Sequence, residues 1–126
     1  MKQAVITDKA PAPAGPYTPG LVVGEFVFVS GQGPFEPKTK KMPESIEEQT
    51  RQTLDNIKGI LEAGGASMAD VVKVTVLLTD LSDFQSMNKV YADYFPEPAP
   101  TRTTFGVALA IPGMRIEIDA IAHVGK

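Results

Sequence analysis

The fold is decided by the stretch Val71-Val72-Lys73-Val74-Thr75-Val76-Leu77-Leu78-Thr79, which lies between two segments with helical patterning. Apolar and polar residues alternate along it. Lys73 and Thr75 fall on one side, and four apolar side chains fall on the other: Val72, Val74, Val76 and Leu78. A period of two is typical of a β-strand with one buried face. We therefore expect a strand whose apolar side is covered by the neighbouring helices.

Helix signals stand on both sides of this strand. Before it, Ser45 and Glu48 have the spacing of a capping box, and Gly64-Gly65 supplies a left-handed stop. The apolar residues between them share one helical face: Ile46, Leu54, Ile57 and Leu61. After it, Ser82 and Gln85 form a second cap pair. They precede a stripe that ends at Pro96 and that we interpret as core: Phe84, Met87, Tyr91, Tyr94 and Phe95.

The remaining apolar segments predict more strands. Residues 21–30 form a hairpin around Gly24-Glu25, residues 101–108 and 114–124 flank a turn at Pro112-Gly113, and residues 2–7 are a further candidate. The element order is that of an α+β domain with two helices on one face of a mixed sheet. The other sheet face is too apolar to be left bare, which favours a homo-oligomer.

Composition excludes several classes of function. The 126 residues fit one domain (residues 1–126), and the absence of Cys together with a single His excludes thiolate and multi-histidine metal sites. A net charge of −3 matches a nucleic acid poorly, so we expect no nucleic-acid partner. No apolar run could span a bilayer, and the N-terminus lacks a signal-peptide core. We expect a cytoplasmic protein without membrane contact.

Two ionisable residues stand out as candidates for chemistry. Arg102 lies early in a strand among small hydroxylated neighbours, where its fork of donors would suit a carboxylate. The alternatives are a solvated strand residue or an intersubunit ion pair. Glu117 lies in a strand near the C-terminus, where it could act as a general base, bind a metal or deter edge-strand aggregation. A two-residue turn at Pro112-Gly113 would pair Glu117 with Ala108. It would also place Arg102 and Glu117 on the same sheet face, roughly 20 Å apart.

The weaker candidates each have an ordinary structural interpretation. Gly31 would let a ligand approach the backbone, or simply belong to a turn. Tyr17 offers a phenol on a proline-rich segment, or packs against it. Asn88 is a surface or pocket amide, and His123 is an isolated histidine with no catalytic context.

An ordered set of short motifs resembles the RidA family, also called YjgF. The set runs from about residue 3 to residue 123 and covers nearly the whole chain: Gly15-Pro16-Tyr17, Ser30-Gly31-Gln32, Gln52 with Asn56, Phe84 with Asn88 and Tyr91, and Arg102 with Ile116-Glu117-Ile118. The resemblance implies a chorismate-mutase-like α+β fold that assembles as a homotrimer with ligand pockets between subunits. It also implies hydrolysis of 2-iminobutanoate and 2-iminopropanoate to 2-keto acids and ammonia, with no cofactor and no metal.

The resemblance also implies roles for individual residues. Arg102 would anchor the substrate carboxylate, and Glu117 would orient water and act as the general base. The substrate-binding residues would be Tyr17, Ser30, Gly31, Asn88 and Thr104. Thr103 and Thr104 stand where many members have Ser or Ala and then Cys, so redox regulation through that Cys does not apply here.

Two other functions stay open at this point. The first is a trimer that binds keto acids and regulates without turnover, because it would use Arg102 in the same way. The second, less favoured, is an endoribonuclease or translation inhibitor, since no basic stripe or catalytic His pair is present.

Overall fold

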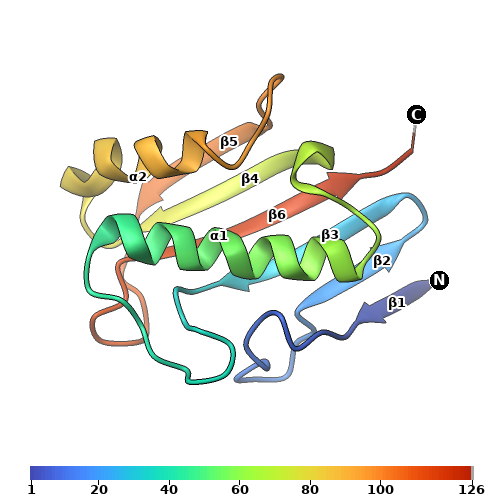
Figure 1. Cartoon of the computed structure of the whole chain (residues 1–126), viewed down its shortest axis with the longest axis horizontal. Helices are drawn as coiled ribbons and strands as arrows, with labels where there is room; N and C mark the ends of the chain where they lie inside the picture. Colours follow the sequence, from blue (N-terminus) through green and yellow to red (C-terminus); the bar gives the residue numbers. More distant parts are fainter. Residues whose placement is uncertain (126) are drawn as a thin grey trace.

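Residues 1–125 are described by a computed structural model, in which six strands form one sheet and two α-helices cover one of its faces (Figure 1). The strands are β1 (Lys2–Val5), β2 (Gly20–Val23), β3 (Phe26–Gln32), β4 (Val71–Leu78), β5 (Thr101–Gly106) and β6 (Ile116–His123). The helices are α1 (Ile46–Ala63) and α2 (Phe84–Ala92), with the short 3-10 helices η1 (Met68–Asp70) and η2 (Leu81–Asp83). The predicted α+β class and element order are confirmed.

The spatial order of the strands is β1-β2-β3-β6-β4-β5. β4 and β5 are parallel, and every other neighbouring pair is antiparallel. The crossover that a parallel pair requires is made by η2 and α2, which pack back onto the sheet. β5 is therefore an edge strand, and the last strand in sequence lies near the middle of the sheet.

Helix α1 begins and ends where the sequence predicts. The Glu48 N–H donates a hydrogen bond to Ser45 Oγ at 3.1 Å, which is one half of the predicted capping box. The other half is wrong, because the Glu48 carboxylate accepts from Arg51 instead. Gly65 adopts a φ of +87° after the last turn. The apolar face of the helix is fully buried against the sheet, as expected for Ile46, Leu54, Ile57 and Leu61. This packing fixes α1 over β3 and β6.

The start of α2 differs from the sequence prediction. The Ser82–Gln85 cap pair is wrong: the Ser82 N–H donates to Asp80 Oδ1 at 2.9 Å, and Asp83 occupies the N-cap position of α2. A 3-10 turn precedes the helix, so Ser82 lies inside that turn and serves as a donor to the preceding carboxylate. The aromatic stripe is buried as predicted at Tyr91 and Phe95.

Strand β4 is the predicted half-buried strand with one correction. Val74, Val76 and Leu78 are fully buried, but Val72 is 44% exposed and Val71 takes its place under the helices. The register of β4 against β6 shifts between Val71 and Lys73, and this irregularity reverses the alternation at the start of the strand.

The predicted pairing of residues 101–108 with residues 114–124 is wrong. Glu117 pairs with Leu77 of β4 rather than with Ala108, and β4 lies between β5 and β6. The segment after β5 therefore crosses from one edge of β4 to the other before β6 begins. The physical reason is that the β4-α2-β5 crossover occupies the outer edge of β4 and leaves the inner edge for β6.

The face of the sheet opposite the helices exposes apolar side chains from several strands. Phe26 and Phe28 of β3 are 42% and 39% exposed, and Phe105 of β5 is 46% exposed. Helices cover only the other face (Figure 1). In residues 1–125, neither helix has the length and hydropathy needed to cross a bilayer.

Candidate functional site

A cavity of about 430 Å³ surrounds the Glu117 side chain on the face of the sheet without helices. The proline-rich segment before β2, the end of β3 and the loop before β6 all contribute to it. Tyr17, Gly31 and Lys40 line it together with Glu117, and the rest of its wall is mainly apolar, including Phe35, Ile111 and Met114. A carboxylate in such a wall is the arrangement expected of a site that acts on a small organic molecule.

Gly31 and Glu117 lie directly against each other. A Cβ at residue 31 would overlap the carboxylate of Glu117, so glycine is required there for the carboxylate to occupy its position. The strand partners Val29 and Gln32 bracket an irregularity in the β3–β6 register, which brings the Gly31 backbone to this point.

The environment of Glu117 changes its acidity. Burial raises the pKa of the Glu117 carboxyl, and the negative charge of Asp119 on the same strand raises it further. A carboxyl with a raised pKa exchanges protons at a pH closer to neutrality, which is the property required of a general acid or base.

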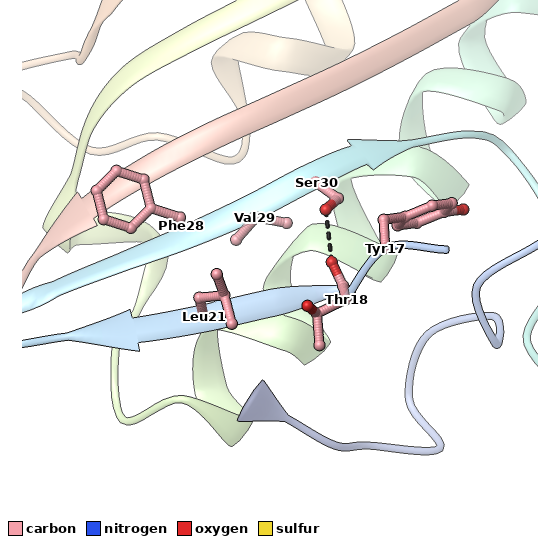
Figure 2. Close-up of a pocket in the computed structure, with 6 residues that line it drawn as sticks. All are labelled: Tyr17, Thr18, Leu21, Phe28, Val29 and Ser30. Carbon is pink, nitrogen blue, oxygen red and sulfur yellow. Dashed lines mark hydrogen bonds between the residues drawn. The ribbon is translucent and has the colours of Figure 1, made fainter. Parts of the chain in front are cut away.

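Ser30 and Tyr17 form the neighbouring wall (Figure 2). The Ser30 hydroxyl donates a hydrogen bond to the Thr18 carbonyl at 2.6 Å, and the Ser30 N–H donates to the Pro19 carbonyl at 2.9 Å. These bonds attach the proline-rich segment to β3. The Tyr17 ring is 48% exposed and lines both the Glu117 cavity and a second hollow of about 310 Å³. Ser30 therefore holds the loop that presents Tyr17.

Buried amides of α1 hold the other walls of the cavity. Asn56 Nδ2 donates to the Gly33 and Phe35 carbonyls at 3.1 and 2.8 Å, and Gln52 donates to Asn56 Oδ1. Gln49 Nε2 donates to the Gly113 carbonyl at 2.9 Å. The sequence motif Gln52-Asn56 is thus explained as an anchor for the loop after β3.

Arg102 does not line this cavity but lies between β5 and α2. Its Cζ atom is 4.7 Å from the centre of the Tyr91 ring and 5.5 Å from that of Phe84. Both distances lie in the range of cation–π contacts. None of the ion pairs within residues 1–125 involves Arg102. The guanidinium therefore lies against aromatic rings and has no carboxylate partner among residues 1–125.

Three polar side chains on α2 and β5, the two elements that meet at Arg102, have no hydrogen-bond partner in the described part of the chain. Asn88 Oδ1, Tyr91 Oη and Thr104 Oγ1 are buried and make no hydrogen bond within residues 1–125. Buried polar groups in proteins are nearly always paired, and the one other unpaired atom found in residues 1–125 is Thr53 Oγ1 of α1. Three of the four thus belong to α2 and β5, where a ligand or a second chain could supply their partners. The sequence predicted Asn88 and Thr104 for this site. It treated Phe84 and Tyr91 only as core, although their helical spacing with Asn88 is a signal for a shared face.

The structure places Arg102 and Glu117 on opposite faces of the sheet, which contradicts the predicted common face. Arg102 pairs with Val74, which is fully buried under the helices, whereas Glu117 pairs with Leu77, whose side chain points the other way. Direct cooperation within one chain is therefore excluded by strand register. Glu117 shares its cavity with Tyr17 and Gly31, whereas Ser30 lines the adjoining hollow that Tyr17 also borders. Arg102 lies on the same strand as Thr104 and beside α2, the helix that carries Asn88.

The structure is a small α+β protein in which Arg102 has no acidic partner within residues 1–125 and Glu117, on the other face of the sheet, has a raised pKa. Residues 7–124 match the family described as Endoribonuclease L-PSP, and the chain belongs to this family, which is the RidA/YjgF family. The expected family membership is confirmed.

Relatives and a solved structure match over nearly the whole chain. A RutC family protein from Pyrococcus horikoshii is 48% identical over 98% of both chains. The 2-iminobutanoate/2-iminopropanoate deaminase of Escherichia coli is 42% identical over 97% of this chain and 98% of the relative. The crystal structure of Escherichia coli TdcF with bound serine matches with a TM-score of 0.92 at 40% identity, covering 96% of this chain and 98% of that one. These names support a deaminase role.

Proposed function

We propose that this protein hydrolyses 2-imino acids, and their enamine tautomers, to 2-keto acids and ammonia. The observation that carries the proposal is the Arg102 guanidinium, which is oriented by two aromatic rings and lacks an acidic partner within residues 1–125. A planar guanidinium of this kind binds a carboxylate through two parallel hydrogen bonds. The ligand class is therefore a small acid held by its carboxylate.

Glu117 supplies the chemical step. Its carboxylate takes a proton from water as the water oxygen bonds to the imine carbon, and returns that proton to the nitrogen as the C=N double bond becomes single. Glu117 then transfers the proton of the new hydroxyl to the nitrogen, and the carbon–nitrogen bond breaks as the C=O of the keto acid forms, which releases ammonia. Water is the only co-reactant. Because the imine carbon is already electrophilic, positioning and one acid–base group are sufficient.

The other predicted residues surround the substrate. Backbone N–H groups at Gly31 and Thr104 would orient its ends, while Tyr17, Ser30 and Asn88 would shape the walls. The preferred substrates are 2-iminobutanoate and 2-iminopropanoate. This choice is supported by the name of the Escherichia coli relative and by the serine bound to TdcF, which is also a small acid with a carboxylate.

The active site is proposed to form between two subunits of a homotrimer. The opposite placement of Arg102 and Glu117 supports this, because a complete site then needs Arg102 from one copy and Glu117 from another. The exposed apolar face that carries Phe28 and Phe105 supports it as well, since large apolar patches are covered in soluble assemblies.

The family description as an endoribonuclease has less support in this chain. Its single His, His123, lies at the opposite end of β6 from Glu117 and faces Glu25 at 3.8 Å. The net charge of −3 also opposes a polyanion. A non-catalytic keto-acid sensor would use the same Arg102, so turnover distinguishes it from an enzyme and binding does not.

A coupled assay tests the proposal. Threonine dehydratase and threonine generate the imine, and wild-type protein should accelerate 2-ketobutyrate formation while the Arg102→Ala and Glu117→Gln variants should not. Co-expression of the two variants at equal levels tests the shared site. Random assembly pairs an intact Arg102 with an intact Glu117 in about one site in four, so about a quarter of wild-type activity should return. Absence of acceleration by wild type rejects the enzyme, and absence of complementation rejects the shared site.

A further inference from the structure

The contact between α2 and β5 includes a buried polar side chain, Tyr91, that has no role in the proposed reaction. α2 runs antiparallel to β5: Tyr91 near its end packs on Arg102, and Leu81, just before its start, lies beside Gly106. This orientation brings Tyr91 and Asn88 along the same edge strand as Arg102 and Thr104. Tyr91 is a buried member of this cluster, only 7% exposed.

The Tyr91 ring is fixed on both sides. Arg102 lies 4.7 Å from its centre, and the Phe95 ring lies 4.6 Å away. The hydroxyl at the end of this fixed ring is buried and has no hydrogen-bond partner within residues 1–125. Packing alone would be satisfied by phenylalanine, because an unpaired buried hydroxyl is a net cost to the fold. The hydroxyl therefore needs an explanation beyond stability.

The charge state of the hydroxyl makes it a donor. Burial raises the pKa of the Tyr91 phenol, and the positive charge and the N–H groups of Arg102, which approach the phenol oxygen without a well-formed hydrogen bond, only partly oppose that effect. Arg102 can only donate, so it does not use the proton of the hydroxyl. Tyr91 thus keeps its proton at neutral pH and requires an acceptor. A carboxylate on Arg102 is such an acceptor, because its two oxygens carry about four lone pairs and the guanidinium fork uses two of them.

We propose that Tyr91 is a ligand-binding residue, whose hydroxyl donates a hydrogen bond to the carboxylate bound by Arg102. The inference rests on the proposed function to the extent that a carboxylate binds to Arg102. Tyr91 then has two roles. Its ring orients the Arg102 guanidinium, and its hydroxyl adds a third hydrogen bond to the bound carboxylate.

The test measures binding of 2-ketobutyrate, the reaction product, by titration calorimetry. Tyr91→Phe keeps the ring and removes the hydroxyl, so the Kd should rise about tenfold or more, the range for a hydrogen bond to a charged group. Tyr94→Phe is the matched control, because that hydroxyl bonds Asp55 at 2.8 Å and its loss should leave the Kd unchanged. The Tm of Tyr91→Phe should equal or exceed that of wild type, since an unpaired polar atom is removed.

Arg102→Ala separates failure of this inference from failure of the proposed function. If Arg102→Ala abolishes binding of 2-ketobutyrate while Tyr91→Phe leaves the Kd at the wild-type value, the role of Tyr91 is wrong and the carboxylate site stands. If Arg102→Ala binds as wild type does, the carboxylate site itself is wrong. A Tyr91→Phe protein that loses binding only together with a lowered Tm would also reject the inference, because that pattern describes a structural residue.

Discussion

The Glu117 carboxylate lies against the Gly31 backbone in the space that a Cβ at residue 31 would fill. The overlapping atom belongs to the far end of a flexible side chain, so a larger residue at 31 can be accommodated by moving Glu117. The cost of that change therefore falls on the position of the carboxylate more than on the stability of the fold.

Gly31→Ala should inactivate the protein without unfolding it. The displaced carboxylate can no longer direct water, and a misplacement of about 1 Å can cost roughly 100-fold in rate. The dehydratase-coupled assay and a thermal melt measure the two effects. Gly24→Asn is a suitable control because Gly24 lies in the turn at the other end of β3, with open space around it and a φ of +57° that Asn tolerates. A fully active Gly31→Ala variant would contradict the proposed role of Glu117.

The pH at which activity declines on acidification should depend on the charge of Asp119, which lies on the same strand as Glu117. The charge of Asp119 is one of two causes that raise the pKa of Glu117. Asp119→Asn removes it, so the pKa of Glu117 falls and the decline of kcat/KM on acidification should begin at a lower pH than in wild type. Glu62→Gln removes one exposed negative charge on α1 and should leave the profile unchanged. An unshifted acid limb in Asp119→Asn would show that Glu117 is not the group that titrates.

Glu117→Gln should lose activity but gain thermal stability at neutral pH. The folded protein raises the pKa of Glu117 above its unfolded value, so the folded state binds the proton more tightly than the unfolded chain. This linkage favours folding below the unfolded pKa of about 4.3 and is lost as pH rises through the folded pKa. The Tm of the Gln variant minus the Tm of wild type should therefore be larger at pH 8 than at pH 4. Melts at fixed protein concentration measure this, and the reverse order would overturn it.

Local patterns predicted the elements of the fold because each depends on neighbours in sequence. The α1 cap at Ser45 and the alternation from Val74 to Leu78 were both correct. The predicted strand pairing was wrong because it depends on which edge of β4 is free. The β4-α2-β5 crossover occupies one edge, and the position of that crossover cannot be read from local sequence patterns. The predicted burial of Val72 was wrong because a shift in register reverses the alternation at the start of β4, and a regular period of two does not predict such a shift.

The sequence predicted which residues belong to the candidate site but did not predict how they are arranged in space. The motifs identified Arg102 and Glu117, but their placement on opposite faces follows from the insertion of β4 between the strands that carry them. Tyr91 was assigned to the core because burial and helical spacing are the same for a packing residue and for one that also contacts a ligand. Only two structural observations favour a ligand contact over simple packing: the short distance from Tyr91 to Arg102 and the buried hydroxyl without a hydrogen-bond partner within residues 1–125.

Arg115→Lys should destabilise the fold through its buried partner. Arg115 Nη2 and Nε donate to the two carboxylate oxygens of Asp83 at 2.7 and 3.2 Å, and Asp83 is 7% exposed. Lysine cannot reproduce this fork, so about 2–3 kcal/mol of unfolding free energy should be lost. Arg51→Lys makes the same substitution in an exposed pair with Glu48 and should cost less than about 0.5 kcal/mol. Urea titrations at one protein concentration compare them, and equal losses would contradict the distinction.

Asn56→Ala should weaken both the fold and the cavity wall. Asn56 is fully buried, and its amide donates to the Gly33 and Phe35 carbonyls while accepting from Gln52. Its removal leaves buried groups unpaired and should cost about 2–4 kcal/mol, read as a lower urea midpoint with an unchanged slope. Because Gly33 and Phe35 line the Glu117 cavity, KM should rise at temperatures where the variant is still folded. Lys58→Ala on the exposed side of α1 should change neither quantity, and an Asn56→Ala variant with wild-type KM would show that the loop keeps its position without the anchor.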